Sequence, residues 1–380
     1  MRLPAPQSVL VVGAGIIGRA AAWRLAEQGH RVSLVDPALA APPTANSPDA
    51  GHPASLSGSQ AALGVLMARV FHRSSGRAWR LRQRSHALWG EWLAELEGRG
   101  HRLPRREGLL LLAATPEELE RQKRIADDRA RLGIPMQRLG PEDLAALTPA
   151  LPGRPLGALL SPEDGQIDPR PLLDALLQEA RRAGCTRVAE TAVALERGPG
   201  GAEPRWRLRL AGGAALEADW LVLGLGLGTG TLLATLGLEL PLEPVLGQAL
   251  ELELASTPAW SWPGVVVWRG VNLVPRPDLP GGKRLWLGAT LEPGQTADPV
   301  ALASLRDLDG AAPDWLRAAT VLRPWQGWRA RPRDRPAPVL EEPEPGLLLA
   351  SGHYRNGVLL APATADWLLE RITNPRTGQS

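Results

Sequence analysis

The fold is decided by the stretch Val9-Leu-Val-Val-Gly-Ala-Gly-Ile-Ile-Gly18, near the start of the chain. Its four leading apolar residues predict a strand. The pattern that follows predicts a helix to Gln28, with Gly29 placed to end that helix. Residues 31–35 predict a second strand. This strand-helix-strand order is the opening of a doubly wound, Rossmann-like α/β domain.

Three glycines of this stretch have the spacing of a dinucleotide-binding turn, and they lie between a strand and a helix, where that spacing is informative. Gly13 permits the tight turn, Gly15 lets the backbone approach a pyrophosphate, and Gly18 allows close packing of helix on strand. Asp36 ends the second strand, and a carboxylate there accepts hydrogen bonds from ribose hydroxyls. The segment therefore predicts a site for the ADP half of a dinucleotide, without separating NAD from FAD.

The composition of the whole chain excludes several other classes. Its 380 residues suffice for two units that each bury a core, and 44% hydrophobic with 22% charged residues is typical of a soluble globular protein. The net charge is only +3. Basic clusters at 102–106 and 329–335 are interrupted by proline or acidic residues, so nucleic acid is not expected as a partner.

Cysteine and histidine usage argues against disulfides and metal sites. The chain has one cysteine, Cys185, and its six histidines lack the spacing of metal ligands. A reducing compartment fits this composition, and no signal peptide precedes the first strand, so a cytoplasmic location is expected. The charge-free stretch 220–238 approaches the length of a membrane span. Its glycines favour a strand, a turn and a helix start, so no membrane span is expected.

Hydrophobic periodicity divides the remaining chain into helical and strand-like stretches. Helices are predicted at 76–98, 115–132, 141–147, 168–182 and 362–372, and a loop at 37–58. Strands are predicted at 109–112, 187–196 paired with 205–210, 221–224 and 346–350, with antiparallel alternation in 247–254, 264–274 and 284–290. Nucleotide-domain features thus recur at the start, middle and end of the chain, so we expect two domains that are each discontinuous in sequence.

Three further segments carry a resemblance to a known family. They are Ser59-Gln-Ala-Ala-Leu-Gly-Val-Leu-Met67, Asp164-Gly-Gln-Ile-Asp-Pro169 and, as the most specific, Gly352-His-Tyr-Arg-Asn-Gly-Val-Leu-Leu-Ala-Pro362. With the N-terminal motif they span nearly the whole chain. Through them the sequence resembles the D-amino-acid oxidase and glycine oxidase family of flavoproteins, and within it the glycine oxidases of thiamine biosynthesis.

The resemblance implies non-covalent FAD, a doubly wound FAD-binding domain and an α+β substrate domain built on an antiparallel sheet. The FAD-binding domain is expected at 1–85, 155–235 and 322–380, and the substrate domain at 86–154 and 236–321. Backbone N–H groups of 352–357 can face the electron-rich pyrimidine edge of a flavin and stabilise its reduced form.

The resemblance also assigns individual residues to the cofactor. Val193 matches the position that contacts adenine, and Gly224 and Gly226 match a second nucleotide-contacting turn. The predicted cofactor contacts are Gly13, Gly15, Ile16, Ile17, Gly18, Asp36, Ser59, Gln60, Ala61, Gly64, Leu66, Val193, Gly224, Gly226, Gly352, His353, Tyr354, Asn356, Gly357, Val358 and Leu359.

An amino-acid oxidase must hold a carboxylate while it presents the Cα–H bond to the flavin, and a guanidinium does this best with two parallel N–H bonds. Arg329 matches the family's carboxylate-binding position, and Arg355 matches a second arginine beside the flavin. Asn272 stands where glycine oxidases have a tyrosine, and Gly270 where they have a nearby histidine. The chain therefore admits a bulkier amine or a secondary amine beside glycine.

Trp268 or Leu291 can fill the space that the missing tyrosine leaves, although a core position is the stronger expectation for both. The predicted reaction is hydride transfer from glycine, sarcosine or a D-amino acid to FAD. It gives an oxo acid, ammonia and peroxide, with Arg329, Arg355 and Asn272 as the catalytic residues.

Other readings stay open at this point. Because either oxygen or a quinone can accept the electrons, a quinone-linked D-amino-acid dehydrogenase is one alternative. A flavin-bearing module without turnover, acting as a binding or tRNA-modification partner, is a second. An NAD-dependent dehydrogenase is a distant third, because it leaves the C-terminal segment unexplained. The sequence does not fix the oligomeric state, and a homo-oligomer is compatible with it.

Overall fold

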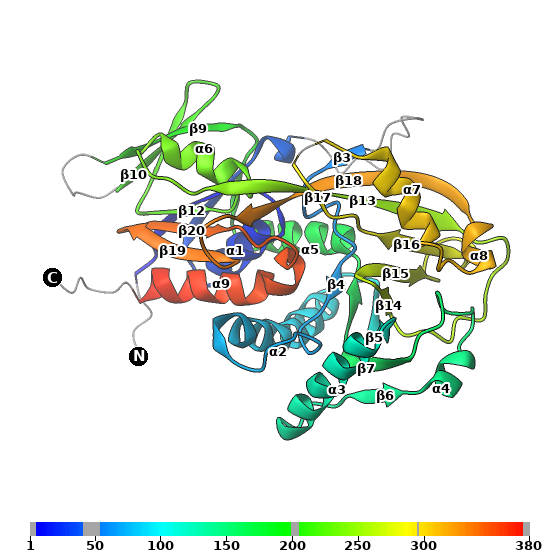
Figure 1. The fold of residues 1–380 in the computed structure, drawn as a ribbon. Coiled ribbons are helices and arrows are strands. Elements are labelled where there is room, and N and C mark those ends of the chain that lie inside the picture. Colours follow the sequence, from blue (N-terminus) through cyan, green and yellow to red (C-terminus); the bar gives the residue numbers. More distant parts are fainter. Residues whose placement is uncertain (1–4, 41–53, 199–204, 295, 375–380) are drawn as a thin grey trace.

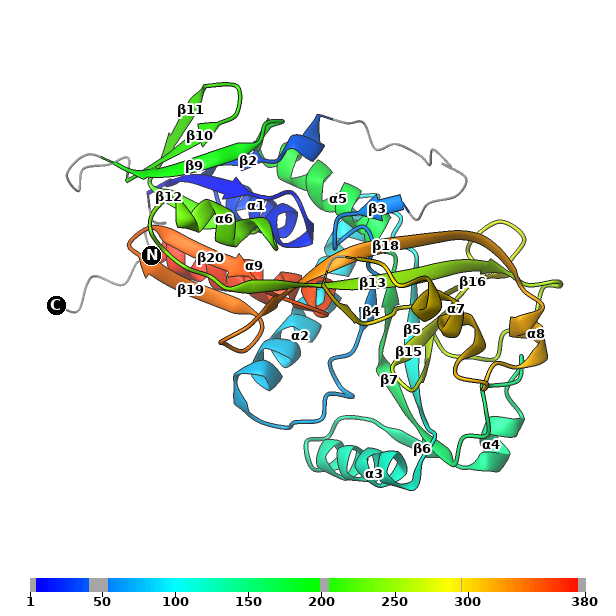
Figure 2. The same cartoon turned by 45° about the horizontal axis from the view of Figure 1, so that its top comes forward.

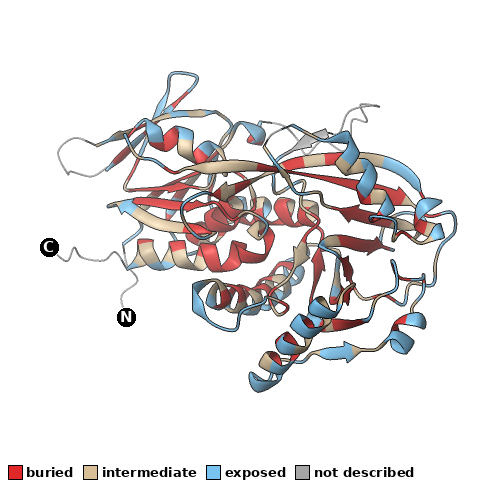
Figure 3. Cartoon of the chain, viewed as in Figure 1, coloured by how far each residue is buried: buried red, intermediate tan, exposed pale blue. Residues whose placement is uncertain are grey.

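The computed structural model describes residues 5–40, 54–198, 205–294 and 296–374, and within these ranges the strands form three sheets (Figure 1). A six-stranded sheet and an 11-stranded sheet form the two halves of the molecule. Figures 1 and 2 show the long strands β13 (Leu242–Glu253) and β18 (Thr320–Pro332) running from one half into the other. Strands of both halves are largely buried, whereas much of the outer surface of the helices is exposed (Figure 3).

The six-stranded sheet is mainly parallel because helices connect its strands. Its half comprises β1 (Ser8–Val12), α1 (Ile16–Glu27), β2 (Arg31–Val35), η1 (Pro37–Leu39), α2 (Gly76–Gly98), α5 (Pro169–Arg182), β8 (Thr186–Val188), β9 (Ala192–Arg197), β10 (Trp206–Leu210), β11 (Ala215–Ala218), β12 (Trp220–Leu223), α6 (Gly228–Ala234), β19 (Val339–Glu344), β20 (Leu347–Ser351) and α9 (Gly357–Thr373). The strand order is β19-β20-β12-β1-β2-β8, and β19 runs antiparallel to β20.

Two layers cover this sheet, one on each face. Val9 and Val11 of β1 belong to a core with α1, α2, α5 and α9. Leu10 and Val12, which point the other way because strand side chains alternate, belong to a core with α6 and the three-stranded sheet β11-β10-β9. The strand order reverses at β1, because β2 lies on one side of it and β12 on the other. Such a switch point opens a crevice at the carboxyl ends of the strands.

The 11-stranded sheet is mainly antiparallel and has the order β3-β18-β13-β16-β15-β14-β5-β7-β4, with β17 beside β13 and β6 beside β7. Its further elements are β3 (Ala54–Leu56), β4 (Val65–Leu66), β5 (Arg105–Ala113), α3 (Pro116–Arg131), β6 (Gln137–Leu139), α4 (Pro141–Ala145), β7 (Gly157–Ile167), β14 (Val265–Trp268), β15 (Val271–Arg276), β16 (Arg284–Gly288), β17 (Glu292–Pro293), α7 (Pro299–Asp307) and α8 (Asp314–Arg317). One face, called the outer face here, packs against α4, α7 and α8. The opposite, inner face packs against the segment 61–70, which contains the edge strand β4.

The predicted α/β fold is confirmed, and many predicted elements have the expected limits. The opening strand-helix-strand unit is present, and α2 covers the predicted residues 76–98. The Asp168 carboxylate accepts from the Arg170 N–H at 3.0 Å and so caps α5 as expected from its sequence. Thr115 caps α3 by accepting from the Glu118 N–H, 3.3 Å away.

One strand prediction was wrong. The stretch 187–196 is two strands, because β8 pairs with β2 in the parallel sheet before the chain turns into β9, which pairs with β10. The antiparallel pairing predicted for the stretch 264–274 is confirmed, because this stretch forms a hairpin. Arg269 and Gly270 both have positive φ angles, of 46° and 83°, and form the two-residue turn between β14 and β15.

The last helix begins at Gly357, five residues before the predicted start at Pro362. A proline inside a helix frees the carbonyl four residues earlier and removes an N–H. The next pair along the helix, the Leu359 carbonyl and the Ala363 N–H, bonds to α2. The Leu359 carbonyl accepts from the Ser85 hydroxyl at 2.6 Å and from the Trp89 indole at 3.0 Å, and the Ala363 N–H donates to Ser85. Tertiary hydrogen bonds therefore let α9 run through its proline.

The stretch 220–238 contains β12, a turn and α6, as its glycines predict. Among the described residues, no helix is both long and apolar enough to cross a membrane. Residues 41–53 of the predicted loop lie outside the described residues. Helix α2 continues without interruption through the predicted domain boundary after residue 85, and the domain boundaries stay predictions.

Candidate cofactor and substrate site

Two glycine turns pack against each other at the switch point of the parallel sheet. Gly13 follows β1 with a φ of 104°, and a Cβ atom on it would lie 2.8 Å from the Gly224 backbone, which follows β12. A Cβ on Gly18 would collide with the Gly13 carbonyl oxygen. These positions cannot accept a side chain without moving the backbone. Gly226, with a φ of 60°, completes the second turn.

Asp36 fixes the far end of this crevice. Its Oδ2 accepts from the Ala14 N–H at 2.7 Å and its Oδ1 from the Ala38 N–H at 2.8 Å. A carboxylate has about four acceptor positions, so two remain for ribose hydroxyls. The Asp36 N–H donates to the Val188 carbonyl at 3.1 Å. Four residues after Val188 the strand β9 begins, and its second residue, Val193, is 48% exposed. An exposed apolar residue at this edge is consistent with a contact to adenine.

Ser59 joins the small-residue segment to the start of α1. Its hydroxyl accepts from the Ile16 N–H at 2.9 Å, and a Cβ on Gly15 would lie 3.1 Å from that hydroxyl. Ile17 follows in the first turn and is buried. Gln60 stays at the surface, where its side chain accepts from the Ser57 hydroxyl. The helix start thus has donors for a phosphate group, and Ser59 stands next to them.

The segment 61–66 then passes between the two halves of the molecule. The Ala61 carbonyl accepts from the Trp325 indole at 2.9 Å. A Cβ on Gly64, whose φ is 73°, would collide with the Ile167 carbonyl oxygen. Leu66 pairs with Gly165 in β4 and β7. Ala62 and Leu66 also pack against the core of the parallel-sheet half, so both halves hold this segment, which the resemblance predicts to lie beneath a flavin.

The turn before α9 lies next to the start of α1. A Cβ on Gly357 would be 3.8 Å from the Ile16 side chain, and Tyr354 has a φ of 54°. The Tyr354 N–H donates to the Ala330 carbonyl and the Asn356 N–H to the His353 carbonyl. Gly352, with a φ of 63°, turns the chain, and Val358 and Leu359 are buried in the first turn of α9.

The His353 side chain points into the protein and not toward solvent. Its Nε2 lies 2.9 Å from the Thr364 hydroxyl, and burial, with the charge of Arg77 nearby, lowers the pKa of His353 to about 3. The imidazole is therefore neutral at physiological pH. Any part that His353 has in cofactor binding comes from its backbone.

These residues fit FAD. Two helix starts, α1 and α9, lie side by side and present backbone N–H groups, the first where a pyrophosphate approaches and the second where a flavin ring would lie. Gly13, Gly18 and Gly64 leave no room for side chains at three close approaches of backbone. The Asp36 carboxylate is held in place with acceptor positions to spare.

Arg329 lies on the inner face of the large sheet. Residues paired across strands share a face, and the pairs are Val245 with Arg329, Gly247 with Gly327 and Ala249 with Trp325. The Arg329 Nη1 donates to the Leu246 and Thr290 carbonyls at 3.1 and 3.2 Å. A Cβ on Gly247 would collide with the guanidinium, so this cation lies flat over a glycine.

The charge on Arg329 is poorly solvated. Burial, and then the charge of Arg355 nearby, lowers the pKa of Arg329 to about 10, so it stays protonated at neutral pH. Within the described ranges its Nη2 forms no hydrogen bond. Arg355 itself is exposed. A half-buried cation with a free N–H edge and a second cation beside it is suited to bind a carboxylate.

Asn272 lies on the same inner face, opposite Gly288, which is in turn opposite Ala249. Its Nδ2 donates to the Gly288 carbonyl at 3.1 Å. Its Oδ1 is buried and has no partner in the part of the chain that the structure describes. An unpartnered buried acceptor is rare and costly, which makes Asn272 a candidate ligand for a bound N–H donor.

The floor between Arg329 and Asn272 is made of small residues, Gly247, Ala249 and Gly288. With ~4.8 Å between strands and ~3.3 Å per residue, Gly247 and Asn272 are about 12 Å apart. That span accommodates an amino acid or a somewhat longer carboxylated amine. Leu63 approaches Gly288 from above, since a Cβ on Gly288 would lie 3.3 Å from it.

Two residues considered for this space lie elsewhere. Trp268 is buried in the outer-face core, as expected for a core residue. Leu291 is 53% exposed, so the core position expected for it was wrong. The turn between β14 and β15 explains why residue 270 is a glycine, because Gly270 has a left-handed backbone conformation there.

Asp164 has a structural role that was not predicted, although it lies in one of the segments that carry the resemblance. The buried Asp164 carboxylate accepts from the N–H groups of Ala68, Arg69 and Val70 at 2.7 to 3.0 Å. It thereby fixes the chain that leaves the flavin segment. Asp164 stands in the polar run Ser161-Pro-Glu-Asp-Gly-Gln166, so no pattern in the sequence distinguished it from its neighbours.

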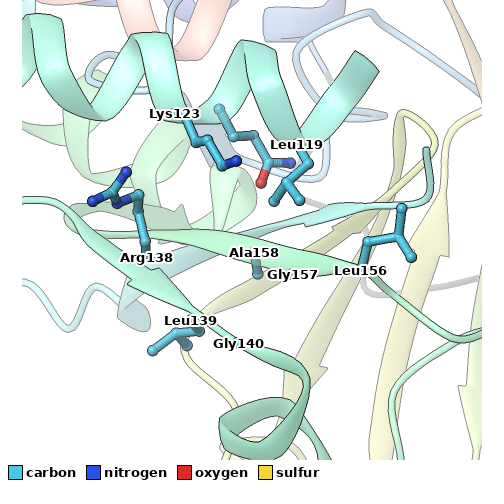
Figure 4. Close-up of a pocket in the computed structure, with 9 residues that line it drawn as sticks. Leu119, Lys123, Arg138, Leu139, Gly140, Leu156, Gly157 and Ala158 are labelled. Atoms are coloured by element: carbon cyan, nitrogen blue, oxygen red, sulfur yellow. The ribbon is translucent and has the colours of Figure 1, made fainter. Parts of the chain in front are cut away.

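A separate hollow of about 250 Å³ lies between α3 and the strands β6 and β7 (Figure 4). Leu119, Leu139 and Ala158 line it with Lys123 and Arg138 at the rim. Both views of the fold place α3 and β6 at the end of the molecule away from α1 and α9 (Figures 1 and 2). This hollow is therefore not part of the candidate site.

Comparison with known proteins agrees with this geometry. The chain matches the family model "FAD dependent oxidoreductase" over residues 8–371. It is 31% identical to the glycine oxidase of Geobacillus kaustophilus over 378 residues, covering 97% of this chain and 93% of that protein. The crystal structure of a glycine oxidase from the same organism superposes with a TM-score of 0.80 at 27% identity, covering 96% and 94% of the two chains.

Two other relatives have different activities. The iminodiacetate oxidase of Chelativorans sp. BNC1 has a TM-score of 0.77 at 26% identity, with 96% and 95% coverage. The bifunctional tRNA 5-methylaminomethyl-2-thiouridine biosynthesis protein of Methylibium petroleiphilum is 32% identical over 352 residues, which cover 87% of this chain and 48% of that protein.

Proposed function

The chain belongs to the FAD-dependent oxidoreductase family, and from that premise we propose that it oxidises a small amino acid or carboxylated amine at the carbon next to nitrogen. The protein is an FAD-dependent enzyme. Its substrate, products and electron acceptor are the parts proposed here.

One observation carries the proposal: Arg329 is a desolvated cation whose free N–H edge borders the small-residue floor of the inner face. A buried charge without a partner is unfavourable, and a substrate carboxylate would provide that partner. Arg355 adds a second positive charge at the exposed side. Together they would fix one end of the substrate.

Asn272 would hold the other end by accepting an N–H from the substrate amine on its Oδ1. An amide accepts from an amine without carrying charge, so it suits a neutral amine. FAD, when bound, supplies the hydride acceptor, and no strong protein base is needed if the amine binds neutral. Water would then hydrolyse the oxidised substrate to the oxo acid and ammonia, or to a primary amine where the substrate is a secondary amine.

The missing tyrosine widens the amine end of this site. Asn272 lies opposite Gly288, which in turn lies opposite Ala249, so less of the amine end is filled by side chains and we expect it to admit a nitrogen that carries a second substituent. The activities named for the relatives, glycine and iminodiacetate oxidation, both use carboxylated amines. We therefore place sarcosine-like and iminodiacetate-like secondary amines beside glycine and D-amino acids in the substrate class.

The test is anaerobic bleaching of the FAD-loaded enzyme by a panel containing glycine, sarcosine, iminodiacetate, D-alanine, D-proline and larger D-amino acids. At least one carboxylated amine should bleach the flavin, and Arg329→Ala should slow that response by about 100-fold or more without loss of flavin. If no member of the panel bleaches the flavin, the proposal is wrong and the alternative of a flavin-bearing module without turnover remains. The tRNA-modification protein among the relatives of this chain is the comparison that bears on this alternative. Peroxide yield with and without a quinone separates an oxidase from a quinone-linked dehydrogenase.

A further inference from the structure

A second cavity lies on the inner face of the large sheet, away from Arg329. It has a volume of about 360 Å³, and its polar lining consists of Asp168, Arg170, Glu251, Arg284, Trp286 and Arg323. Trp286 and Trp325, with ring centroids 5.8 Å apart, separate it from the floor around Gly288, and Trp325 is tied to Ala61. The cavity is therefore distinct from the proposed substrate site.

The unpartnered polar atoms at this cavity are all hydrogen-bond donors. Trp286 is 3% exposed, and its Nε1 has no partner among the residues that the structure describes; the same holds for the buried Nε of Arg284. Arg276 stands directly behind them, with its guanidinium carbon 3.8 Å from the Trp286 ring centroid. Its side chain is 2% exposed, and its Nη1 also lacks a partner within the described ranges.

The carboxylates of the cavity are already occupied. Asp168 accepts from the Arg170 N–H at 3.0 Å and from the Arg276 Nη2 at 2.7 Å. Glu251 accepts from the Arg323 Nε at 2.6 Å, and its other oxygen is 3.7 Å from Arg284. These acids cannot satisfy the remaining donors.

Arg170 leaves the cluster with an excess of positive charge. Its guanidinium forms no ion pair with the described residues, although burial and the charges of Arg323 and Arg276 act against its own charge. With the ion pairs of Arg284 and Lys283 to Glu253 included, the cluster has five cations and four carboxylates. The cations are Arg170, Arg276, Lys283, Arg284 and Arg323, and the carboxylates are Asp168, Glu251, Glu253 and Asp278. Arg170 also lies in the first turn of the 14-residue helix α5, where the helix dipole favours an anion.

We propose that this cavity binds a small oxyanion, a carboxylate or phosphate group, through Arg170, Arg284 and the Trp286 indole N–H. An oxyanion has only acceptors, so it matches a site in which only donors are free. It would neutralise the excess charge and join the start of α5, in the nucleotide-binding half, to strands β13, β16 and β18. Its binding should therefore stabilise the junction of the two halves.

The test uses the FAD-loaded enzyme, so that the pyrophosphate site is filled, and follows thermal unfolding in sodium phosphate and sodium acetate against sodium chloride of equal ionic strength. At a tenfold excess over the dissociation constant, an oxyanion should raise the Tm by about 2 °C relative to chloride. The salt that saturates at the lower concentration identifies the preferred group, phosphate or carboxylate.

Arg170→Gln should remove this oxyanion-dependent shift, and Arg170→Lys should keep part of it because the charge remains. Arg181→Gln is the matched control, since Arg181 is an exposed arginine at the other end of α5 and its loss changes the net charge equally. Flavin absorbance per protein shows that each variant is folded. A wild-type response no larger than that to chloride, or a full response in Arg170→Gln, would overturn the proposal.

Discussion

The cofactor crevice and the substrate face of this protein are built on different principles. In the crevice, backbone atoms form the binding surface, because glycines permit close approaches of the chain and helix starts present N–H groups. On the substrate face, side chains from β13, β15, β16 and β18 meet across a sheet. The crevice therefore depends on residues whose identity is dictated locally, whereas the substrate face depends on register between strands far apart in the chain.

The comparison predicts that the largest single effect comes from the crevice. Gly18→Ala places a Cβ against the Gly13 carbonyl oxygen, so the turn must move. We expect FAD affinity to fall by roughly 1,000-fold or more, equivalent to about 4 kcal/mol. Flavin absorbance after dialysis against known free FAD measures this. Gly90→Ala is the control, because nothing lies within 4 Å of a Cβ there and alanine favours the helix.

On the substrate face, Arg329→Ala should lower kcat/KM for carboxylated substrates by about 100-fold to 1,000-fold, which corresponds to about 3 to 4 kcal/mol. FAD affinity should not change, because the guanidinium bonds only to the Leu246 and Thr290 carbonyls among the described residues. Steady-state kinetics provides the measurement. Arg207→Ala, which removes an exposed arginine paired with Glu217, should leave kcat/KM as it is. Equal losses in both variants would remove Arg329 from the site.

His353 gives the crevice a pH dependence that the substrate face lacks. The pKa of His353 is about 3 in the folded protein and 6.5 in the unfolded chain, so between these values only the unfolded chain binds the proton. Stability is therefore unaffected by His353 above pH 6.5 and falls as the pH drops, by about 2 kcal/mol at pH 5.

His353→Asn should reduce the loss of unfolding free energy between pH 6.5 and 5, because asparagine can bond to Thr364 but does not titrate. Denaturant unfolding of the FAD-loaded enzyme at several pH values measures the slope. If wild type and variant lose stability in parallel, His353 is not the buried titrating group that the structure indicates.

Asn272→Leu should have the smallest effect of these changes. It removes the unpartnered Oδ1, so stability should stay equal or increase, while KM for the best amine should rise by about tenfold. Asn272→Tyr, which restores the residue typical of glycine oxidases, should shift the preference among the panel toward glycine. An unchanged KM in both variants would place Asn272 outside the substrate site.

The cofactor crevice could be predicted from the sequence, whereas much of the substrate face could not. The glycine spacing and Asp36 predicted the crevice because each residue answers a local backbone requirement. The floor of Gly247, Ala249 and Gly288 was not predicted, since only the strand register brings these residues together. The start of α9 was missed because Ser85 and Trp89, over 270 positions away, compensate for the proline inside it.

The central claim is that the inner face binds the substrate through its carboxylate. The most direct measurement is the rate of anaerobic flavin reduction by the best amino acid of the panel and by the amine that lacks only its carboxylate. The account predicts at least a ~100-fold slower reduction by the amine in wild type, and near-equal rates for the two compounds in Arg329→Ala. Equal rates in wild type, or a large remaining preference in Arg329→Ala, would contradict it.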